Sequence, residues 1–391
     1  MCRIISATPP RAGATFRTGP SRLKDDWGIY DTGSGKEREG KLVLLNYAPL
    51  HVRLPKVFTR LSFFWRSFVD TNIKEIKLEE LNAEGFISEQ CRSISARVGD
   101  ARAVNALSGG VDSSAVTMLG NRALGSRLKT YFVDNGLMRQ GEPERVAELL
   151  TKCGAAVEIV DAREEFFASL AGKTDPEEKR QAITDTFYKK VFGRLVKQCS
   201  ARYLLQGTIY TDVEETVAGI KRQHNILEQL GIDTERAYGY HVIEPLIQLR
   251  KPAVRVVAKA LGLPEEIYDR RPFPGPALVA RVIGEATPER IALVRQATFI
   301  LDQELSATKA FQYMAILHRD RIPGVRNGKR DYGLQIEIRS WDTQDAVTAT
   351  PTRLPFETME RLADRITSEV PGVVSVSYNI TKKPPSTMEA V

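Results

Sequence analysis

Cysteine and histidine are scarce in this chain of 391 residues, which holds four of each. The four cysteines lie far apart and none forms a CxxC pair: Cys2, Cys91, Cys153 and Cys199. This spacing argues against a disulfide framework and a zinc ribbon, and it favours a reducing, cytoplasmic location. Long apolar runs are also missing, since even residues 57–69 contain Arg60 and Arg66. We therefore expect no membrane span, and no secretory leader because no apolar segment follows Arg3.

The excess of basic charge is small and lies at one end of the chain. The sequence has 56 Lys and Arg against 49 Asp and Glu, a net charge of +7. Residues 1–75 hold 13 basic and 7 acidic side chains, a net of +6, which leaves about +1 for the other 316 residues. A nucleic-acid enzyme is expected to spread basic side chains over its binding face. The distribution therefore argues against a nucleic-acid partner.

The order of apolar and amphipathic segments predicts an α/β domain after an irregular start. Residues 1–72 are punctuated by proline and glycine and keep no amphipathic period, so we expect an irregular, basic N-terminal extension there. Strands are expected at 103–107, 129–134, 156–161, 202–205 and 240–243, and helices at 75–98, 113–124, 142–153, 175–197 and 251–261. Apolar strands separated by helices are typical of a doubly wound parallel sheet, which we assign to residues 73–271. Ligands bind such sheets beyond the carboxyl ends of the strands.

A proline-rich break marks the start of a second domain. Residues 272–276 hold three prolines, which neither a helix interior nor a central strand accommodates. Beyond the break we expect helices at 288–305 and 354–369 and strands at 311–317, 333–340 and 373–380. The glycine-containing basic segment 324–329 is interpreted as a hairpin loop between two strands. These elements predict a smaller α+β domain over residues 272–391.

The most informative motif is the turn between the first expected strand and the helix after it. It reads Ser108-Gly109-Gly110-Val111-Asp112-Ser113-Ser114. Two glycines let the backbone turn tightly, and the exposed N–H groups and the helix dipole favour an anion. Asp112 supplies a carboxylate suited to Mg²⁺ that is bound to phosphate oxygens. The turn lacks the lysine of GxxxxGK[ST] and the spacing of GxGxxG, so it is neither a Walker loop nor a dinucleotide fingerprint.

This turn resembles the pyrophosphate loop of the N-type ATP pyrophosphatases. Those enzymes adenylylate a carbonyl oxygen, release pyrophosphate, and let a nitrogen or sulfur nucleophile displace AMP. Further segments resemble the GMP synthetase family within that group: 131–139, 160–166, 205–210, 219–225, 243–246, 271–276 and 378–389. The resemblance covers residues 73–391. It implies an adenine nucleotide alpha-hydrolase-like fold followed by a dimerisation domain.

The resemblance also implies an activity and a set of site residues. It implies a C–N ligase that aminates XMP to GMP through an adenylyl-XMP intermediate, with Mg²⁺ as cofactor, ATP and ammonia as co-substrates and a homodimeric assembly. The ATP phosphates would lie against Ser108, Gly109, Gly110, Val111, Asp112, Ser113 and Ser114, and the adenine beside Val133. Asp112 and the lid residue Lys221 would be catalytic. Gln312, Lys383 and Glu389 match the positions that the family uses for the XMP base, phosphate and ribose.

Two departures from the family pattern leave alternatives open. Residues 1–72 contain no Cys-His-Glu triad, and Cys2 is interpreted as incidental, so ammonia is expected to come from solution or from a separate glutaminase subunit. The tail ends Met388-Glu389-Ala390-Val391 where the family usually has Ile-Glu-Trp-Glu, which leaves the acceptor open. A tRNA-thiolating ATP pyrophosphatase would need a cysteine pair near the nucleotide. A non-catalytic nucleotide-binding paralogue is the other alternative.

Overall fold

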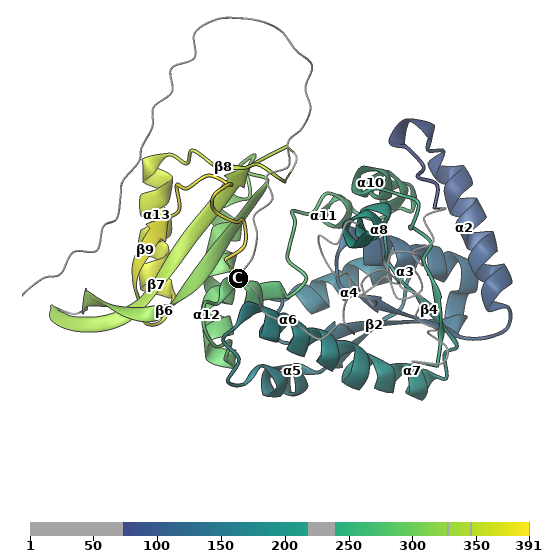
Figure 1. Cartoon of the computed structure of the whole chain (residues 1–391), viewed down its shortest axis with the longest axis horizontal. Helices are drawn as coiled ribbons and strands as arrows, with labels where there is room; N and C mark the ends of the chain where they lie inside the picture. The colour runs from purple at the N-terminus through teal and green to yellow at the C-terminus, as the bar shows by residue number, and fades with distance from the viewer. Residues whose placement is uncertain (1–72, 218–238, 327, 345, 391) are drawn as a thin grey trace, which may run out of the picture. The chain divides into compact units, whose positions relative to one another are not determined.

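A parallel sheet of five strands forms the first part of the structure (Figure 1). The computed structural model describes residues 73–217, 239–326, 328–344 and 346–390; the expected N-terminal extension and Lys221 lie outside the described residues. The strand order is β3-β2-β1-β4-β5. The strands are β1 (Ala103–Leu107), β2 (Leu128–Asp134), β3 (Val157–Asp161), β4 (Tyr203–Leu205) and β5 (His241–Ile243). The chain winds outward from β1 to β3 and then returns to the other side of β1, which places the topological switch point between β1 and β4. The prediction of a doubly wound parallel sheet is confirmed.

The helices of this part lie on both faces of the sheet. Their bounds are η2 (Leu78–Glu80), α2 (Ala83–Val98), α3 (Val111–Leu124), η3 (Gly125–Arg127), α4 (Glu142–Lys152), α5 (Arg163–Leu170), α6 (Pro176–Asp185), η4 (Thr186–Phe192), α7 (Gly193–Cys199), α8 (Tyr210–Val217), α10 (Lys251–Ala260) and α11 (Glu265–Tyr268). Helices α2, α3 and α10 share one core on one face of the sheet. Helices α5, α6 and α7 contribute to a second core on the other face. Among the described residues, no helix combines the length and the apolar character needed to cross a membrane.

Two of the observed helices differ from the expected ones, one in its first residue and the other in its helix type. The helix expected from residue 75 begins at Ala83, because the side chain of Asn82 caps it by accepting a hydrogen bond from the Gly85 amide at 3.1 Å. The helix expected over 175–197 is present from Pro176 to Cys199, but it is not α-helical throughout. The chain there forms α6, a π-helical turn (η4) and α7, and the rings of Phe187 and Phe192 stack across η4.

The second part of the structure is a mixed sheet covered by two long helices. It contains η5 (Ala277–Arg281), α12 (Pro288–Leu305), β6 (Gln312–Arg326), β7 (Lys329–Asp342), β8 (Thr350–Pro351), α13 (Phe356–Glu369) and β9 (Val373–Tyr378). Strands β6 and β8 pair antiparallel with β7, whereas β9 pairs with β7 in parallel. The α+β prediction is confirmed, and helix α12 has the expected bounds because the Thr287 side chain caps its first turn. The hairpin loop expected over 324–329 is shorter than predicted, because β6 and β7 stay paired as far as Arg326 and Lys329.

One hydrophobic core is shared by the two parts. It includes Val104 of β1 and Phe166 of α5 together with Ile291 of α12 and Leu317 of β6. Because buried side chains from both parts belong to this cluster, the domain boundary at residues 271 and 272 stays a prediction. The shared core brings the carboxyl edge of the parallel sheet close to the segment that leads into the second part.

Candidate functional site

The turn after β1 is shaped by its own serine and glycine residues. Gly109 has φ +76°, a conformation that side chains with a Cβ adopt at a cost. The Ser113 hydroxyl accepts a hydrogen bond from the Ser108 amide at 3.1 Å and donates one to the Gly110 carbonyl at 3.1 Å. The Ser114 amide donates to the same carbonyl, which starts helix α3 at Val111. The predicted strand–turn–helix context of this motif is therefore present.

Asp112 lies in the first turn of α3 with its two carboxylate oxygens in different surroundings. Its Oδ2 accepts a hydrogen bond from Lys251 Nζ at 2.5 Å, and this lysine begins helix α10. Its Oδ1 is buried and accepts no hydrogen bond from the described residues. An unpartnered carboxylate oxygen beside an anion-binding turn suits Mg²⁺ that arrives with phosphate oxygens. Among the described residues, no group of three or more acidic, cysteine or histidine side chains is arranged to hold a metal ion without further ligands.

The switch point brings two further positions to this edge of the sheet. Gly207, which follows β4, lies so close to the start of α3 that a Cβ there would be 3.2 Å from the Asp112 carbonyl carbon and 3.2 Å from the Ser113 nitrogen. Sequence reasoning missed Gly207, whose signal was a glycine two residues after the end of an apolar strand. Val133 is buried on β2, one residue beyond Phe132, which makes the last pair with β1. The position predicted for the adenine therefore lies at the carboxyl edge of the sheet.

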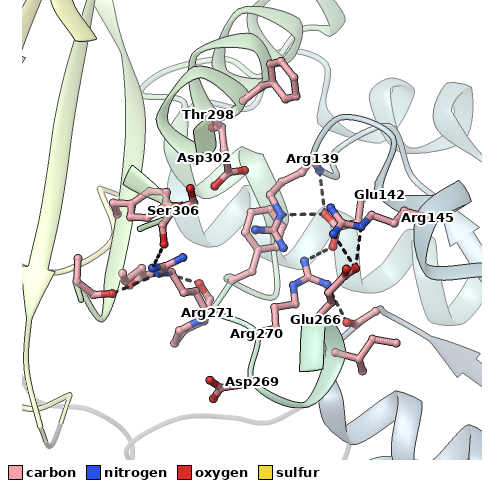
Figure 2. A pocket seen from close by; sticks show the side chains of 18 of the residues that line it. Arg139, Glu142, Arg145, Glu266, Asp269, Arg270, Arg271, Thr298, Asp302 and Ser306 are labelled. Carbon is pink, nitrogen blue, oxygen red and sulfur yellow. Dashed lines mark hydrogen bonds and ion pairs between the residues drawn. The ribbon is translucent and has the colours of Figure 1, made fainter. Parts of the chain in front are cut away.

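Figure 2 shows part of the lining of a basic cavity of about 770 Å³. Gly109 of the turn after β1 also lines this cavity. It is lined by six arginines, one lysine and four acidic residues: Arg139, Arg145, Arg255, Arg270, Arg271, Arg281, Lys309, Glu142, Glu266, Asp269 and Asp302. Seven cations against four carboxylates leave the lining with a formal charge of +3. A concave site with an excess of guanidinium groups favours an anionic ligand such as a phosphorylated nucleoside.

An ion-pair network joins the cavity wall to the turn after β1. Figure 2 shows Arg139 and Arg270 directed toward Glu142. Glu142 is buried, forms an ion pair with Arg270 and accepts a hydrogen bond from Arg139 Nε at 3.2 Å. Burial acts to raise the pKa of Glu142, but the charges and hydrogen bonds of the two arginines outweigh it and hold the pKa below its ordinary value. Arg270 Nη1 also donates to the Gly109 carbonyl at 2.7 Å, so one guanidinium contacts both the network and the turn.

The proline-rich segment places an aromatic ring among three arginines. The guanidinium carbons of Arg139, Arg270 and Arg281 lie 4.9, 5.8 and 5.0 Å from the centre of the Phe273 ring. Cation–π attraction favours such an arrangement and keeps the guanidinium groups close together. Arg139 and Arg270 lie in or beside segments that carry the family resemblance, but sequence reasoning gave neither of them a role.

Two of the three residues predicted for XMP meet in the structure. Gln312, at the start of β6, is buried, and its Nε2 donates to Glu389 Oε1 at 2.9 Å and to the Pro272 carbonyl at 3.3 Å. Lys383 does not join this pair: its Nζ donates to the Ala346 carbonyl at 2.7 Å. The contact between Gln312 and Glu389 joins residues 77 positions apart and lies beside the lining of the cavity.

The cysteines give no support to a thiolating enzyme. Cys91, Cys153 and Cys199 are free thiols, and none of them lines the cavity. The thiol of Cys153 donates to the Gly262 carbonyl, and that of Cys199 donates to the Val196 carbonyl of its own helix. Within the described part of the chain, no cysteine pair faces the turn after β1 as sulfur transfer would require.

Comparison with known proteins identifies the family. Residues 86–275 match the family model described as NAD synthase, and residues 300–390 match the model described as GMP synthase C terminal domain. The chain is 44% identical over 309 residues to a subunit of the glutamine-hydrolyzing GMP synthase of Archaeoglobus fulgidus, covering 79% of this chain and 99% of that protein. The chain belongs to this family of GMP synthase subunits. The protein of the same name from Methanoculleus marisnigri is 46% identical over 310 residues, with 79% and 99% covered, and that of Thermococcus kodakarensis is 45% identical over 309 residues, with 78% and 99% covered.

This membership confirms the resemblance predicted from the sequence. The match of the GMP synthase C terminal domain falls on the mixed sheet that carries Gln312 and on the tail that carries Glu389, and the NAD synthase match covers the parallel sheet and the turn after β1. The chain is thus a GMP synthase-type ligase whose relatives are named as one subunit of the enzyme.

Proposed function

We propose that this chain is the synthetase half of a two-subunit GMP synthase, which uses ATP and Mg²⁺ to aminate XMP. The XMP O2 oxygen attacks the α-phosphorus of ATP, the bond to the β-phosphate breaks, and pyrophosphate leaves. Ammonia then attacks C2 of the adenylyl-XMP, a proton is lost from the nitrogen, and AMP leaves with the former O2 oxygen.

The position of Gly109 is the observation that supports this proposal most strongly. Gly109 belongs to the phosphate turn and also lines the basic cavity. Transfer of an adenylyl group requires the α-phosphorus and the acceptor oxygen to meet at one point. A nucleotide on the turn and a second nucleotide in the cavity would adjoin at Gly109, where Arg270 binds the carbonyl. The geometry therefore supports a reaction between two bound nucleotides.

The proposed roles of the residues follow from their chemistry. The amides of the turn from Ser108 to Ser114 would bind the phosphates, and Val133 would contact the adenine through its backbone. Asp112 would hold Mg²⁺, which supplies charge neutralisation at the phosphate oxygens when it is bound. Lys251, held at Asp112, would offer its ammonium group to the same phosphates. Lys221, outside the described residues, is proposed as a second cation for pyrophosphate.

The acceptor site is proposed to lie in the basic cavity. The excess of arginine charge would attract the XMP phosphate, while Gln312 would hydrogen-bond the base and Glu389 a ribose hydroxyl. Lys383 is proposed to contact the phosphate, which requires its side chain to leave the Ala346 carbonyl.

The proposed assembly is a cytoplasmic homodimer that receives ammonia from a separate glutaminase. Several of the most exposed large apolar side chains lie on the second part of the structure, among them Val325 (76% exposed), Tyr332 (50%) and Phe356 (66%). Exposed apolar side chains of this size favour a protein interface. The relatives are named as one subunit of a glutamine-hydrolyzing enzyme, which supports a partner that hydrolyses glutamine.

The experiment that tests the function is a turnover assay on the purified full chain. With ATP, Mg²⁺, XMP and ammonium we expect loss of XMP absorbance and release of AMP and pyrophosphate in equal amounts. ADP as the main nucleotide product would overturn the proposed chemistry. Glutamine in place of ammonium should give no turnover with this chain alone, and equal rates with both would contradict the proposed separate glutaminase.

A further inference from the structure

Arg281 is a buried cation whose only ion pair among the described residues is with the tail of the chain. Its side chain is 2% exposed, and its Nε lies 3.7 Å from Glu389 Oε2. That distance is too long for a hydrogen bond. Arg281 Nε and Glu389 Oε2 are both buried and lack a hydrogen-bond partner among the described residues. Charge attraction therefore holds Arg281 and Glu389 together. Arg281 Nε can still donate a hydrogen bond, and Glu389 Oε2 can still accept one.

A buried guanidinium needs a carboxylate close by, because an uncompensated charge is costly away from water. Burial lowers the pKa of Arg281, and the Glu389 carboxylate acts in the opposite direction. The neighbouring arginines of the cavity, Arg139 and Arg270, have Glu142 as their partner. Arg281 therefore attracts Glu389, which lies two residues before the end of the sequence in a tail with no helix or strand of its own.

Other contacts hold the same tail from two further sides. Arg339 Nη1 donates to the carbonyls of Thr387 and Glu389 at 3.0 and 3.3 Å, which fixes the backbone. Gln312 Nε2 donates to Glu389 Oε1, which fixes one carboxylate oxygen. Among the residues that the structure describes, only Arg281 acts on Oε2, the oxygen that can still accept a hydrogen bond.

We propose that Arg281 is a positioning residue for the acceptor nucleotide, because its charge holds the Glu389 carboxylate in place against Gln312, at the position proposed for the substrate's ribose. The inference rests on the proposed function, since it assumes that XMP binds beside Gln312 and Glu389. Arg281 acts through Glu389 and leaves the ATP turn untouched, so its loss affects one substrate and spares the other. A role in folding alone would not separate the two substrates.

The test is a double-mutant cycle on the full chain with XMP, ATP, Mg²⁺ and ammonium. Arg281→Met and Glu389→Gln are each expected to raise the KM for XMP about ten- to hundred-fold and to change the KM for ATP less than about two-fold. The double variant should be no worse than the worse single variant, because both changes remove the same positioned oxygen. Multiplying effects in the double variant would overturn the inference.

Arg290→Met is the matched control. Arg290 is a partly buried arginine that, like Arg281, has a buried, unpartnered Nε, but it donates to the carbonyls of Ile283 and His318 and does not line the cavity. We expect it to lower thermal stability and to leave the KM for XMP unchanged. A rise in the KM for XMP equal to that of Arg281→Met would show that loss of any buried arginine suffices, and would overturn the proposed role.

If circular dichroism shows that Arg281→Met does not fold, Arg281→Lys is measured in its place. Arg281→Lys keeps the positive charge but not the guanidinium geometry, and it should raise the KM for XMP about three- to ten-fold in the wild-type background and not at all in Glu389→Gln. An equal rise in both backgrounds would overturn the inference. Failure of the wild-type chain to consume XMP would instead overturn the proposed function, and this inference with it.

Discussion

At the scale of single residues, the two carboxylate oxygens of Asp112 differ in their surroundings. Asp112 Oδ2 is bound to Lys251, whereas Oδ1 is buried and unpartnered among the described residues. A buried carboxylate oxygen without a donor is unfavourable unless a cation or donor arrives with the ligand. A buried oxygen without a hydrogen-bond partner, such as Asp112 Oδ1, is typical of a binding site, where the ligand supplies the missing interaction.

Asp112→Asn should abolish most of the activity and leave the fold intact. The amide keeps the size of the side chain but has no charge to hold Mg²⁺ or to balance Lys251, so we expect kcat to fall by about 100-fold or more. Circular dichroism should be unchanged. Asp364→Asn, on the exposed side of α13, is the control and should have wild-type turnover. Wild-type turnover by Asp112→Asn would refute the assigned role.

Lys383 and Lys382 offer a second comparison between neighbouring residues. If Lys383 binds the XMP phosphate, Lys383→Ala should raise the KM for XMP about ten- to hundred-fold and leave the KM for ATP nearly unchanged. Lys382 is exposed and precedes it on an extended segment, where adjacent side chains point in opposite directions. Lys382→Ala should therefore have little effect. Similar steady-state constants for the two variants would show that the tail does not bind the phosphate.

At the scale of elements, one buried lysine attaches α6 to the second part of the structure. Lys179 is 1% exposed, and its Nζ donates to the Val282 carbonyl, just after η5, at 2.8 Å. Burial, followed by the nearby charge of Arg290, lowers the pKa of Lys179 to about 8. The folded state therefore favours the neutral amine, while the unfolded chain keeps an ordinary lysine pKa of about 10.4.

The lowered pKa of Lys179 should make the free energy of unfolding depend on pH. Below pH 8 the ammonium is charged in both states, and its burial destabilises the fold. As pH rises from about 8 toward 10.4, the folded state loses its proton first and this destabilisation is relieved, so stability increases. Between about pH 7 and 9.5 we expect the free energy of unfolding of wild type to gain about 1–2 kcal/mol relative to Lys179→Met, measured by urea unfolding. Parallel pH curves for the two proteins would contradict the lowered pKa.

The hairpin β6–β7 shows why some element bounds escaped sequence reasoning. Gly324 was expected in a hairpin loop and Gly333 at the first position of a strand, yet both lie within paired strands. A Cβ at Gly333 would lie 2.3 Å from the Val374 side chain of β9, and one at Gly324 would lie 2.7 Å from it. The glycines are needed because β9 packs closely there, and that contact joins segments far apart in the sequence. Helix α12, by contrast, has its start signal in adjacent residues and was predicted with the observed bounds.

At the scale of the whole molecule, the two proposed substrate sites differ in how much of each could be predicted from the sequence. The turn after β1 is one contiguous motif between an apolar strand and a helix, so its structural context was predictable. The cavity combines Gly109, Glu142, Arg270 and Gln312, which only the folded chain brings together. Its arginines look in the sequence like ordinary surface charges. Resemblance to a family supplied Gln312 and Glu389, but Arg281 became visible only through its burial and its distance to the tail.

The last prediction concerns assembly through the end of the β6–β7 hairpin. Val325 and Tyr332 are exposed there, and the register pairs Pro323 with Tyr332 and Val325 with Arg330, which places these side chains on one face. Burying this face against a second copy would remove apolar area from water and stabilise a dimer. We expect sedimentation of the wild-type chain at twice its 43.6 kDa mass.

Val325→Glu combined with Tyr332→Glu should shift the chain toward the monomer mass, because two carboxylates in each copy would be brought together and desolvated in the interface. Val256→Glu is the matched control, since Val256 is an exposed apolar residue of α10 in the parallel-sheet part and should leave the dimer intact. Equal dissociation by Val256→Glu would point to a general loss of stability. A wild-type chain that sediments as a monomer at micromolar concentration would refute the proposed homodimer outright, and a dimer unaffected by the hairpin variant would place the interface elsewhere.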